Sequence, residues 1–111
     1  MDVKEQDVRE YLKLDGSNPF QEWLSKLKDV QTRARIRVRL NRIRMGNFGD
    51  CRPVGEGVHE FRIPFGPGFR VYFGNDGPTV VILLCGGEKK SQPRDIETAK
   101  KYWQDYRRRT S

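Results

Sequence analysis

Residues 58–90 read VHEFRIPFGPGFRVYFGNDGPTVVILLCGGEKK, and their pattern predicts three consecutive strands. Within residues 58–63 and again within residues 69–73, apolar side chains alternate with polar or charged ones, which is typical of strands with one buried face. Turns rich in Gly, Pro and Asn, at residues 66–68 and 74–78, separate the three runs. Residues 79–85 are apolar without alternation, as expected of an inner strand that is covered on both faces. The stretch therefore predicts a small antiparallel meander.

The same alternation predicts that a group of polar side chains shares one face of the meander, because successive strand residues point to opposite faces. Two lysines then follow the inner strand. This group is the best candidate for a functional site in the sequence. Its members are Glu60, Arg62, Arg70 and Tyr72 on the strands, with Lys89 and Lys90 after them.

Length and charge restrict the possible functions. The chain has 111 residues, which predicts one domain, residues 1–111, with a single core. Lys and Arg number 22 against 15 Asp and Glu, giving a formal net charge of +7. A small protein of this charge usually binds a polyanion such as nucleic acid or an acidic protein; the alternative is a solvated basic surface without a partner.

Cysteine and histidine usage argues against a metal site. Cys51 and Cys85 show no metal-binding spacing and the chain has one histidine, so we expect neither a metal nor a cofactor. The sequence shows no secretion signal and no apolar run long enough to cross a bilayer. We therefore expect a cytoplasmic protein, with reduced thiols and no membrane partner.

Other elements are predicted on both sides of the meander. Asn18 and Pro19 form a helix start, and apolar residues follow them at helical spacing as far as residue 27. Pro93 opens a final helix that ends in a basic run. A short edge strand is predicted within residues 8–14, and a loop at residues 47–57.

Residues 31–45 fit both a strand and a helix. Arginines alternate with apolar residues from residue 33 to residue 40, yet Ile36, Leu40 and Ile43 also lie at helical spacing. We predict a helix, because no Gly or Pro interrupts residues 26–45 and a strand of that length would be unusual. Such a helix carries two arginine stripes, which either contact a polyanion or form a solvated face. One stripe is Arg33, Arg37 and Arg44, and the other is Arg35, Arg39 and Arg42.

Four segments, through their order and spacing, resemble the phage-derived killer proteins of bacterial addiction modules, the HigB-like branch of the RelE/ParE toxin superfamily. The segments are NPFQEWLSKLKD at 18–29, ARIRVRLNRIRMGNFGD at 34–50, VGEGVHEFRIPFGPGFRVYF at 54–73, and VVILLCGGEKKSQPRDIETAKKYWQDY at 80–106.

This resemblance implies an α+β, RelE-like fold, in which two N-terminal helices pack on a small, twisted, mostly antiparallel sheet with a C-terminal helix alongside. It also implies the toxin of a type II toxin–antitoxin system. Such a toxin is held inactive by an antitoxin, commonly of the helix-turn-helix type, and would meet operator DNA only through that partner.

The resemblance leaves the target open. RelE-like relatives are endoribonucleases that cleave messenger RNA in the ribosomal A site, whereas ParE-like relatives poison DNA gyrase without chemistry of their own. Fold alone does not separate these outcomes. A third hypothesis is a non-catalytic basic module that binds nucleic acid.

Messenger RNA cleavage of this kind resembles attack of a 2′-hydroxyl on the adjacent phosphate. Arg62 and Arg70 are the candidates for holding the phosphate, because a guanidinium pairs with phosphate oxygens in a bidentate manner. Lys89 and Lys90, which match basic residues of the family, are candidates for binding phosphate or protonating the leaving oxygen. For the general base that would accept the 2′-hydroxyl proton, the candidates are Glu60 and Tyr72.

Two features complicate this site. The RelE-like tyrosine or histidine just after the last strand is missing, since residues 91–94 read SQPR. The charged residues of the meander could instead form cross-strand ion pairs on an exposed face. Further candidates for RNA contact are Arg37, Arg44, Arg94 and Tyr102.

Overall fold

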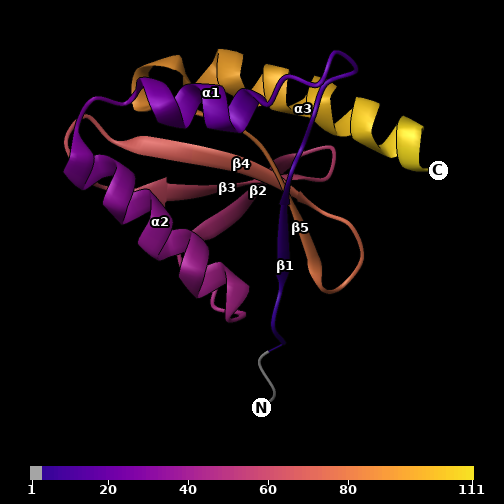
Figure 1. The fold of residues 1–111 in the computed structure, drawn as a ribbon, viewed down its shortest axis with the longest axis horizontal. Coiled ribbons are helices and arrows are strands. Elements are labelled where there is room, and N and C mark those ends of the chain that lie inside the picture. The colour runs from indigo at the N-terminus through magenta and orange to yellow at the C-terminus, as the bar shows by residue number, and fades with distance from the viewer. Residues whose placement is uncertain (1–3) are drawn as a thin grey trace.

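The computed structural model describes residues 4–111, so residues 1–3 of the predicted domain lie outside the described residues. Five strands form one mixed sheet, in the order β1-β5-β4-β3-β2, with β1 parallel to β5 and the other pairs antiparallel (Figure 1). The elements in chain order are β1 (Asp7–Glu10), α1 (Pro19–Lys26), α2 (Val30–Arg44), β2 (Cys51–Gly55), β3 (Val58–Ile63), β4 (Phe69–Asn75), β5 (Val80–Glu88), the 3-10 turn η1 (Lys89–Ser91) and α3 (Gln92–Thr110).

The predicted meander is confirmed as β3, β4 and β5. Its register places Glu60 opposite Tyr72, and Arg62 opposite Arg70, so these four side chains start from one face of the sheet. The inner position of the third strand is also confirmed, because β5 lies between β1 and β4.

Helices cover both faces of the sheet. On one face, Phe20 of α1 and Ile36 of α2 join a core cluster with alternate residues of the strands, among them Phe61 and Val71. On the other face, Trp103 of α3 packs in a second cluster with the residues of opposite parity, such as Tyr72 and Ile82. The meander is therefore buried on both sides, and β4 is buried along all but its last residue.

The helix prediction for residues 31–45 is confirmed, since α2 spans nearly the same residues. Asp29 caps its N-terminus by accepting a hydrogen bond from the Gln31 backbone N–H at 3.0 Å. Asn18 caps α1 in the same way, accepting from the Gln21 N–H at 3.0 Å, as its position before Pro19 predicted.

The predicted fold class is wrong. The chain starts with strand β1, not with two helices, and this strand joins the sheet parallel to β5, so the sheet is five-stranded and mixed. An edge strand was predicted near this place, but residues 7–10 form it instead of residues 8–14. A four-residue strand shows too little alternation to fix its bounds, and its parallel pairing depends on residues more than seventy positions away.

The predicted loop at residues 47–57 is also wrong in part, because Cys51–Gly55 form strand β2. β2 is the edge strand beside β3 and pairs Arg52 with Glu60. Pro53 and Gly55 interrupt the sequence pattern that would have indicated this strand. Proline is tolerated in edge strands and at bulges, and β2 offers both, since it is an edge strand whose register shifts between Pro53 and Gly55.

A glycine in β5 makes the packing of α1 possible. A Cβ atom at Gly86 would lie 2.3 Å from Cε3 of Trp23, well inside contact distance. We expect Gly86→Ala to lower the free energy of unfolding by about 1–3 kcal/mol, measured by urea denaturation, because the added methyl group overpacks the contact. In a Trp23→Ala background the same change should cost little; an equal loss in both backgrounds would contradict this explanation.

Candidate nucleic-acid interface

A hollow of 360 Å³ lies where β3 and β4 meet their connecting turn and η1 begins. Three of the predicted site residues line it: Arg62 from β3, Arg70 from β4 and Lys89 from η1. The Lys89 backbone N–H donates to the Gly68 carbonyl at 3.0 Å, which holds η1 against the turn. Two cross-strand partners and the end of β5 thus bring three cations to one place. We call this hollow the phosphate hollow, after the ligand that was predicted from the sequence for Arg62 and Arg70.

Glu60 is the anionic centre beside the phosphate hollow, and its side chain is fully buried. Its Oε1 accepts from Nε of Arg52 at 3.0 Å and from Nε of Arg62 at 3.4 Å, and Oε2 accepts from Nε2 of Gln92 at 3.0 Å. Burial raises the pKa of this carboxyl, but the hydrogen bonds from Gln92 and Arg52 and the nearby guanidinium charges outweigh it, so the pKa lies below its ordinary value. Glu60 is therefore an ionised anchor for arginines.

Arg70 is the most buried cation of the phosphate hollow, with its side chain 9% exposed. Its Nε lies 3.6 Å from Oε1 of Glu60, close enough for an ion pair and too far for a hydrogen bond. Nε and Nη1 are buried and have no hydrogen-bond partner among residues 4–111. Buried guanidinium donors without hydrogen-bond partners are costly, and the charge of Glu60 offsets part of that cost.

Tyr72 does not reach the phosphate hollow. Its side chain is fully buried under α3, opposite Glu60 in the sheet. Burial and the negative charges of Glu60 and Asp95 raise the pKa of its phenol, which stays neutral. Glu60 and Tyr72 were both predicted to share an accessible face, and the structure instead covers that face with α3. Neither side chain is placed to take a proton from a bound substrate.

The remaining predicted residues lie in three places. Lys90 and Arg94 line an adjoining hollow of 460 Å³ at the start of α3. Arg37 and Arg44 are exposed on α2 and line none of the hollows described here. Tyr102 stacks on Tyr11, with ring centroids 5.1 Å apart, and so packs α3 against the segment after β1.

Two residues that contact the Glu60 carboxylate were not predicted as site residues. Arg52 was assigned to a loop, although its position in β2 opposite Glu60 makes it a direct partner of that carboxylate. Gln92 opens α3, and its amide reaches Glu60 across the sheet face. No sequence signal indicates Gln92, because its contact depends on how α3 docks.

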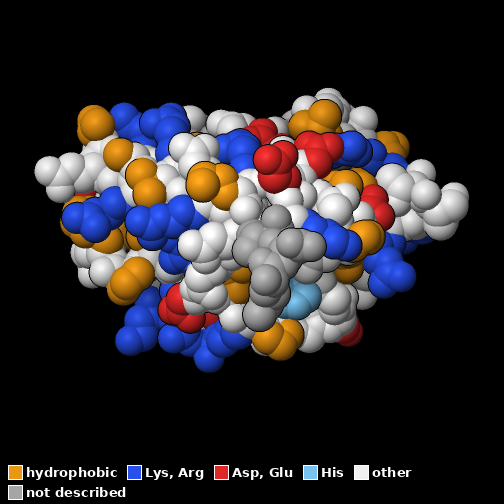
Figure 2. Space-filling model, turned by 90° about the horizontal axis from the view of Figure 1, so that it is seen from below, with side chains coloured by type: hydrophobic (Ala, Val, Ile, Leu, Met, Phe, Trp, Pro, Cys, Tyr) orange, Lys and Arg blue, Asp and Glu red, His pale blue; other side chains and the backbone are white. Residues whose placement is uncertain are grey.

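On the face drawn in Figure 2, Lys and Arg side chains are more numerous on one side, although others lie at the opposite end. Figure 2 shows Lys and Arg side chains gathered on the side where α2 and the β3–β4 turn lie in Figure 1. Among residues 4–111, no three His, Cys, Asp or Glu side chains gather in a way that would hold a metal ion. Within the same residues, no helix has the length and apolar character needed to cross a membrane.

A comparison with known proteins gives one informative relative. The chain is 49% identical over 81 residues to an uncharacterized protein of Haemophilus influenzae, a match that covers 73% of this chain and 82% of that protein. The chain belongs to the family of this protein. No protein-family model matches the chain.

Proposed function

We propose that this protein is the toxin of a type II toxin–antitoxin pair and that it inhibits translation as a ribosome-dependent endoribonuclease. The observation that supports the proposal most directly is the phosphate hollow itself, which Arg70, a guanidinium with its side chain only 9% exposed, lines from β4. Arg62 and Lys89 line the same hollow. Three cations around one hollow suit a phosphate group, which is a polyvalent acceptor.

The proposed reaction is attack of a 2′-hydroxyl oxygen on the adjacent phosphorus. The 2′-hydroxyl proton passes to water, the P–O5′ bond breaks, and the products are a 2′,3′-cyclic phosphate and a 5′-hydroxyl. Arg70 and Arg62 hold the phosphate and stabilise the extra charge of the pentavalent transition state. Lys89 gives its proton to the departing 5′ oxygen.

Glu60 acts as a positioning residue in this proposal, because it holds Arg62 and Arg70 from behind. The lining of the phosphate hollow includes no carboxylate, imidazole or phenol, so the chain supplies charge and an acid but no evident base. A reaction that also needs the ribosome fits this composition.

The proposed partners follow from the same hypothesis. An antitoxin of the helix-turn-helix type would neutralise the protein, and operator DNA would be met only through that antitoxin. The proposed place of action is the cytoplasm, where ribosomes and messenger RNA are found.

Induced expression in bacteria tests the proposal. Primer extension should map new 5′ ends on a message that is translated and none on a copy whose start codon has been removed. Growth arrest with both messages intact would contradict the nuclease and direct the search to DNA gyrase. Absence of growth arrest would contradict the proposal that the protein is a toxin.

A further inference from the structure

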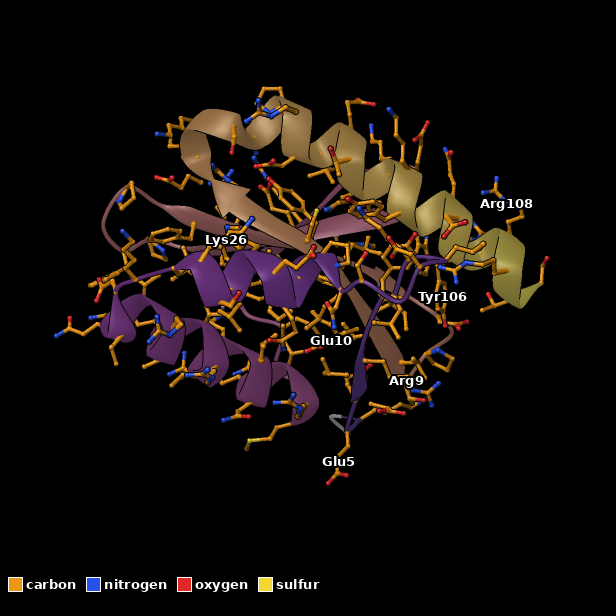
Figure 3. The ribbon with its side chains drawn as sticks, turned by 45° about the horizontal axis from the view of Figure 1, so that its top comes forward. Glu5, Arg9, Glu10, Lys26, Tyr106 and Arg108 are labelled. Carbon is orange, nitrogen blue, oxygen red and sulfur yellow. The ribbon has the colours of Figure 1, made fainter. Side chains whose placement is uncertain are left out.

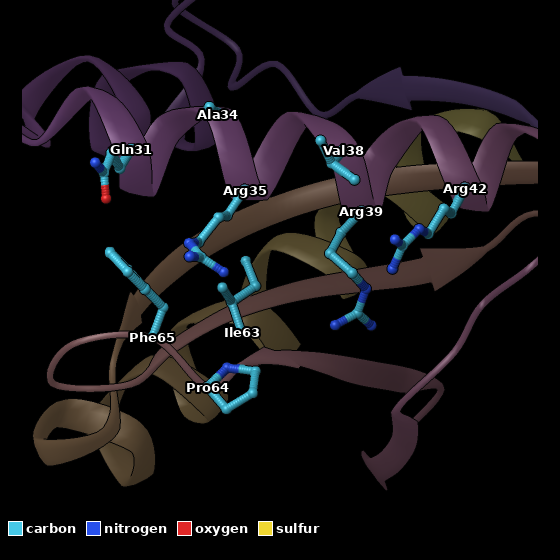
Figure 4. Close-up of a pocket in the computed structure, with 9 residues that line it drawn as sticks. All are labelled: Gln31, Ala34, Arg35, Val38, Arg39, Arg42, Ile63, Pro64 and Phe65. Carbon is cyan, nitrogen blue, oxygen red and sulfur yellow. The ribbon is translucent and has the colours of Figure 1, made fainter.

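A second hollow, of 540 Å³, lies on the other side of the segment that carries Ile63 and Pro64. It is formed between α2 and the end of β3 with the turn that follows (Figure 4). Ile63 and Pro64 line this hollow and the phosphate hollow alike, so only that segment separates the two. We call the second hollow the α2 groove.

The α2 groove combines an apolar floor with a cationic rim. Val38, Pro64 and Phe65 contribute apolar surface, and Val38 is 47% exposed. Arg35 and Arg42 project from α2 on the same side of the helix, as Figure 4 shows. Neither arginine makes an ion pair with another residue of the described chain.

Arg35 and Phe65 form the most specific feature of the α2 groove. The guanidinium carbon of Arg35 lies 4.1 Å from the centroid of the Phe65 ring, a cation–π arrangement. Planar groups of this kind are the surfaces on which unpaired nucleobases stack.

Arg39 has a different part in the α2 groove. It donates to the backbone carbonyls of Arg62 and Phe48, the latter at 3.3 Å, and so ties α2 to β3 and to the loop before β2. Because both of its terminal nitrogens already donate to backbone carbonyls, Arg39 fixes the shape of the groove, and Arg35 and Arg42 are the arginines with charge to offer a ligand.

We infer that the α2 groove binds the nucleotides that flank the phosphate held in the phosphate hollow, as a continuation of one path for single-stranded RNA. This inference rests on the proposed function for the identity of the nucleic acid. Both hollows have cationic linings without a carboxylate and they share Ile63 and Pro64, which fits a continuous polyanion. An acidic protein helix would account for the α2 groove alone and would leave its contact with the phosphate hollow unexplained.

The experiment compares two double variants of α2 that lose the same charge. Arg35→Ala with Arg42→Ala removes the groove arginines. Arg37→Ala with Arg44→Ala removes two exposed arginines that were predicted from the sequence as RNA contacts but that line neither hollow, so the comparison also tests that prediction. The probe is a fluorescently labelled oligouridylate of about eight nucleotides, which is within the usual site size for single strands. Binding is measured by anisotropy without ribosomes at several salt concentrations.

We expect the groove variant to bind at least about tenfold more weakly than the matched variant and to show a shallower dependence of affinity on salt. Phe65→Leu keeps an apolar side chain and should weaken binding at least about fivefold through lost stacking. Circular dichroism should show the same unfolding midpoint for both double variants.

Equal affinities of the two double variants would overturn the inference. The inference would also be overturned if the wild-type protein did not bind the RNA but bound, through Arg35 and Arg42, a helical peptide with a leucine stripe flanked by glutamates. RNA binding through the α2 groove without message cleavage would contradict the proposed nuclease activity and support the α2 groove as an RNA-binding site. Message cleavage together with equal RNA affinities of the two double variants would support the nuclease activity and contradict RNA binding in the α2 groove.

Discussion

Replacing Arg62 by alanine should lower the rate of message cleavage on the ribosome by about 100-fold or more, the usual cost of removing a donor that stabilises transition-state charge. Arg62 is chosen because its side chain is 36% exposed and lines the phosphate hollow, so it reaches a bound phosphate without rearrangement of the core. The measurement is single-turnover cleavage of a short message in a purified translation system.

Two comparisons make this result specific. Arg62→Lys keeps the charge but loses the planar fork, and should recover part of the rate. Arg9→Ala removes an exposed arginine that pairs with Asp7 on β1 (Figure 3), and it should leave the rate unchanged because β5 and β4 separate β1 from β3 in the sheet. A rate for Arg62→Ala within threefold of the wild type would exclude Arg62 from phosphate binding, provided that urea denaturation shows an intact fold.

Replacing Glu60 by glutamine should lower the free energy of unfolding by about 3–5 kcal/mol, because it removes the counter-charge of a buried cation. Arg52 and Arg62 are partly exposed and regain water when the carboxylate is lost, but Arg70 is not. The main cost is therefore an uncompensated guanidinium at Arg70. Urea denaturation measures the loss.

A double-mutant cycle tests the origin of this loss. Arg70→Met in the Glu60→Gln background should restore much of the stability, since the buried charge is then gone with its partner. Glu97→Gln is the control, because its carboxylate is 70% exposed and 3.7 Å from Lys100, and should cost less than about 1 kcal/mol. Additive effects of Glu60→Gln and Arg70→Met would contradict the proposed pairing.

The Glu60→Gln variant should also change how the free energy of unfolding depends on pH. The pKa of Glu60 in the folded protein lies below its ordinary value of 4.5. The stability that this carboxylate contributes is therefore fully present above pH 4.5 and is lost as the pH falls through the lower folded value. The acid side of the stability curve should be less steep for Glu60→Gln than for the wild type, and parallel curves would argue against an ionised Glu60.

Sequence reasoning succeeded where a period extends over enough residues. Alternation in residues 58–73 predicted β3 and β4 and the pairing face of Arg62 and Arg70, because a strand period of two fixes the parity of each side chain. It failed for β1, which is short, and for β2, where Pro53 and Gly55 interrupt the pattern.

The site shows the same limit in another form. Parity indicates which residues share a face, but it does not indicate what covers that face. Glu60 and Tyr72 were correctly grouped with the arginines, and yet α3 buries both of them. The docking of α3 depends on contacts such as the one between Trp103 and Gly74, where a Cβ atom would lie 2.5 Å from the indole ring, and no local pattern predicts such a contact.

The parallel pairing of β1 with β5 has a consequence for synthesis of the chain. Asp7 pairs with Val80 and Glu10 with Leu83, so the first strand made has no neighbour until the last strand has been translated. Gln92, which completes the shell of Glu60, follows later still. Contacts of such long sequence separation form slowly. Because β1 pairs in the sheet only with β5, a chain that ends before residue 80 would leave its first strand without a partner, and the sheet is complete only when most of the chain has been made.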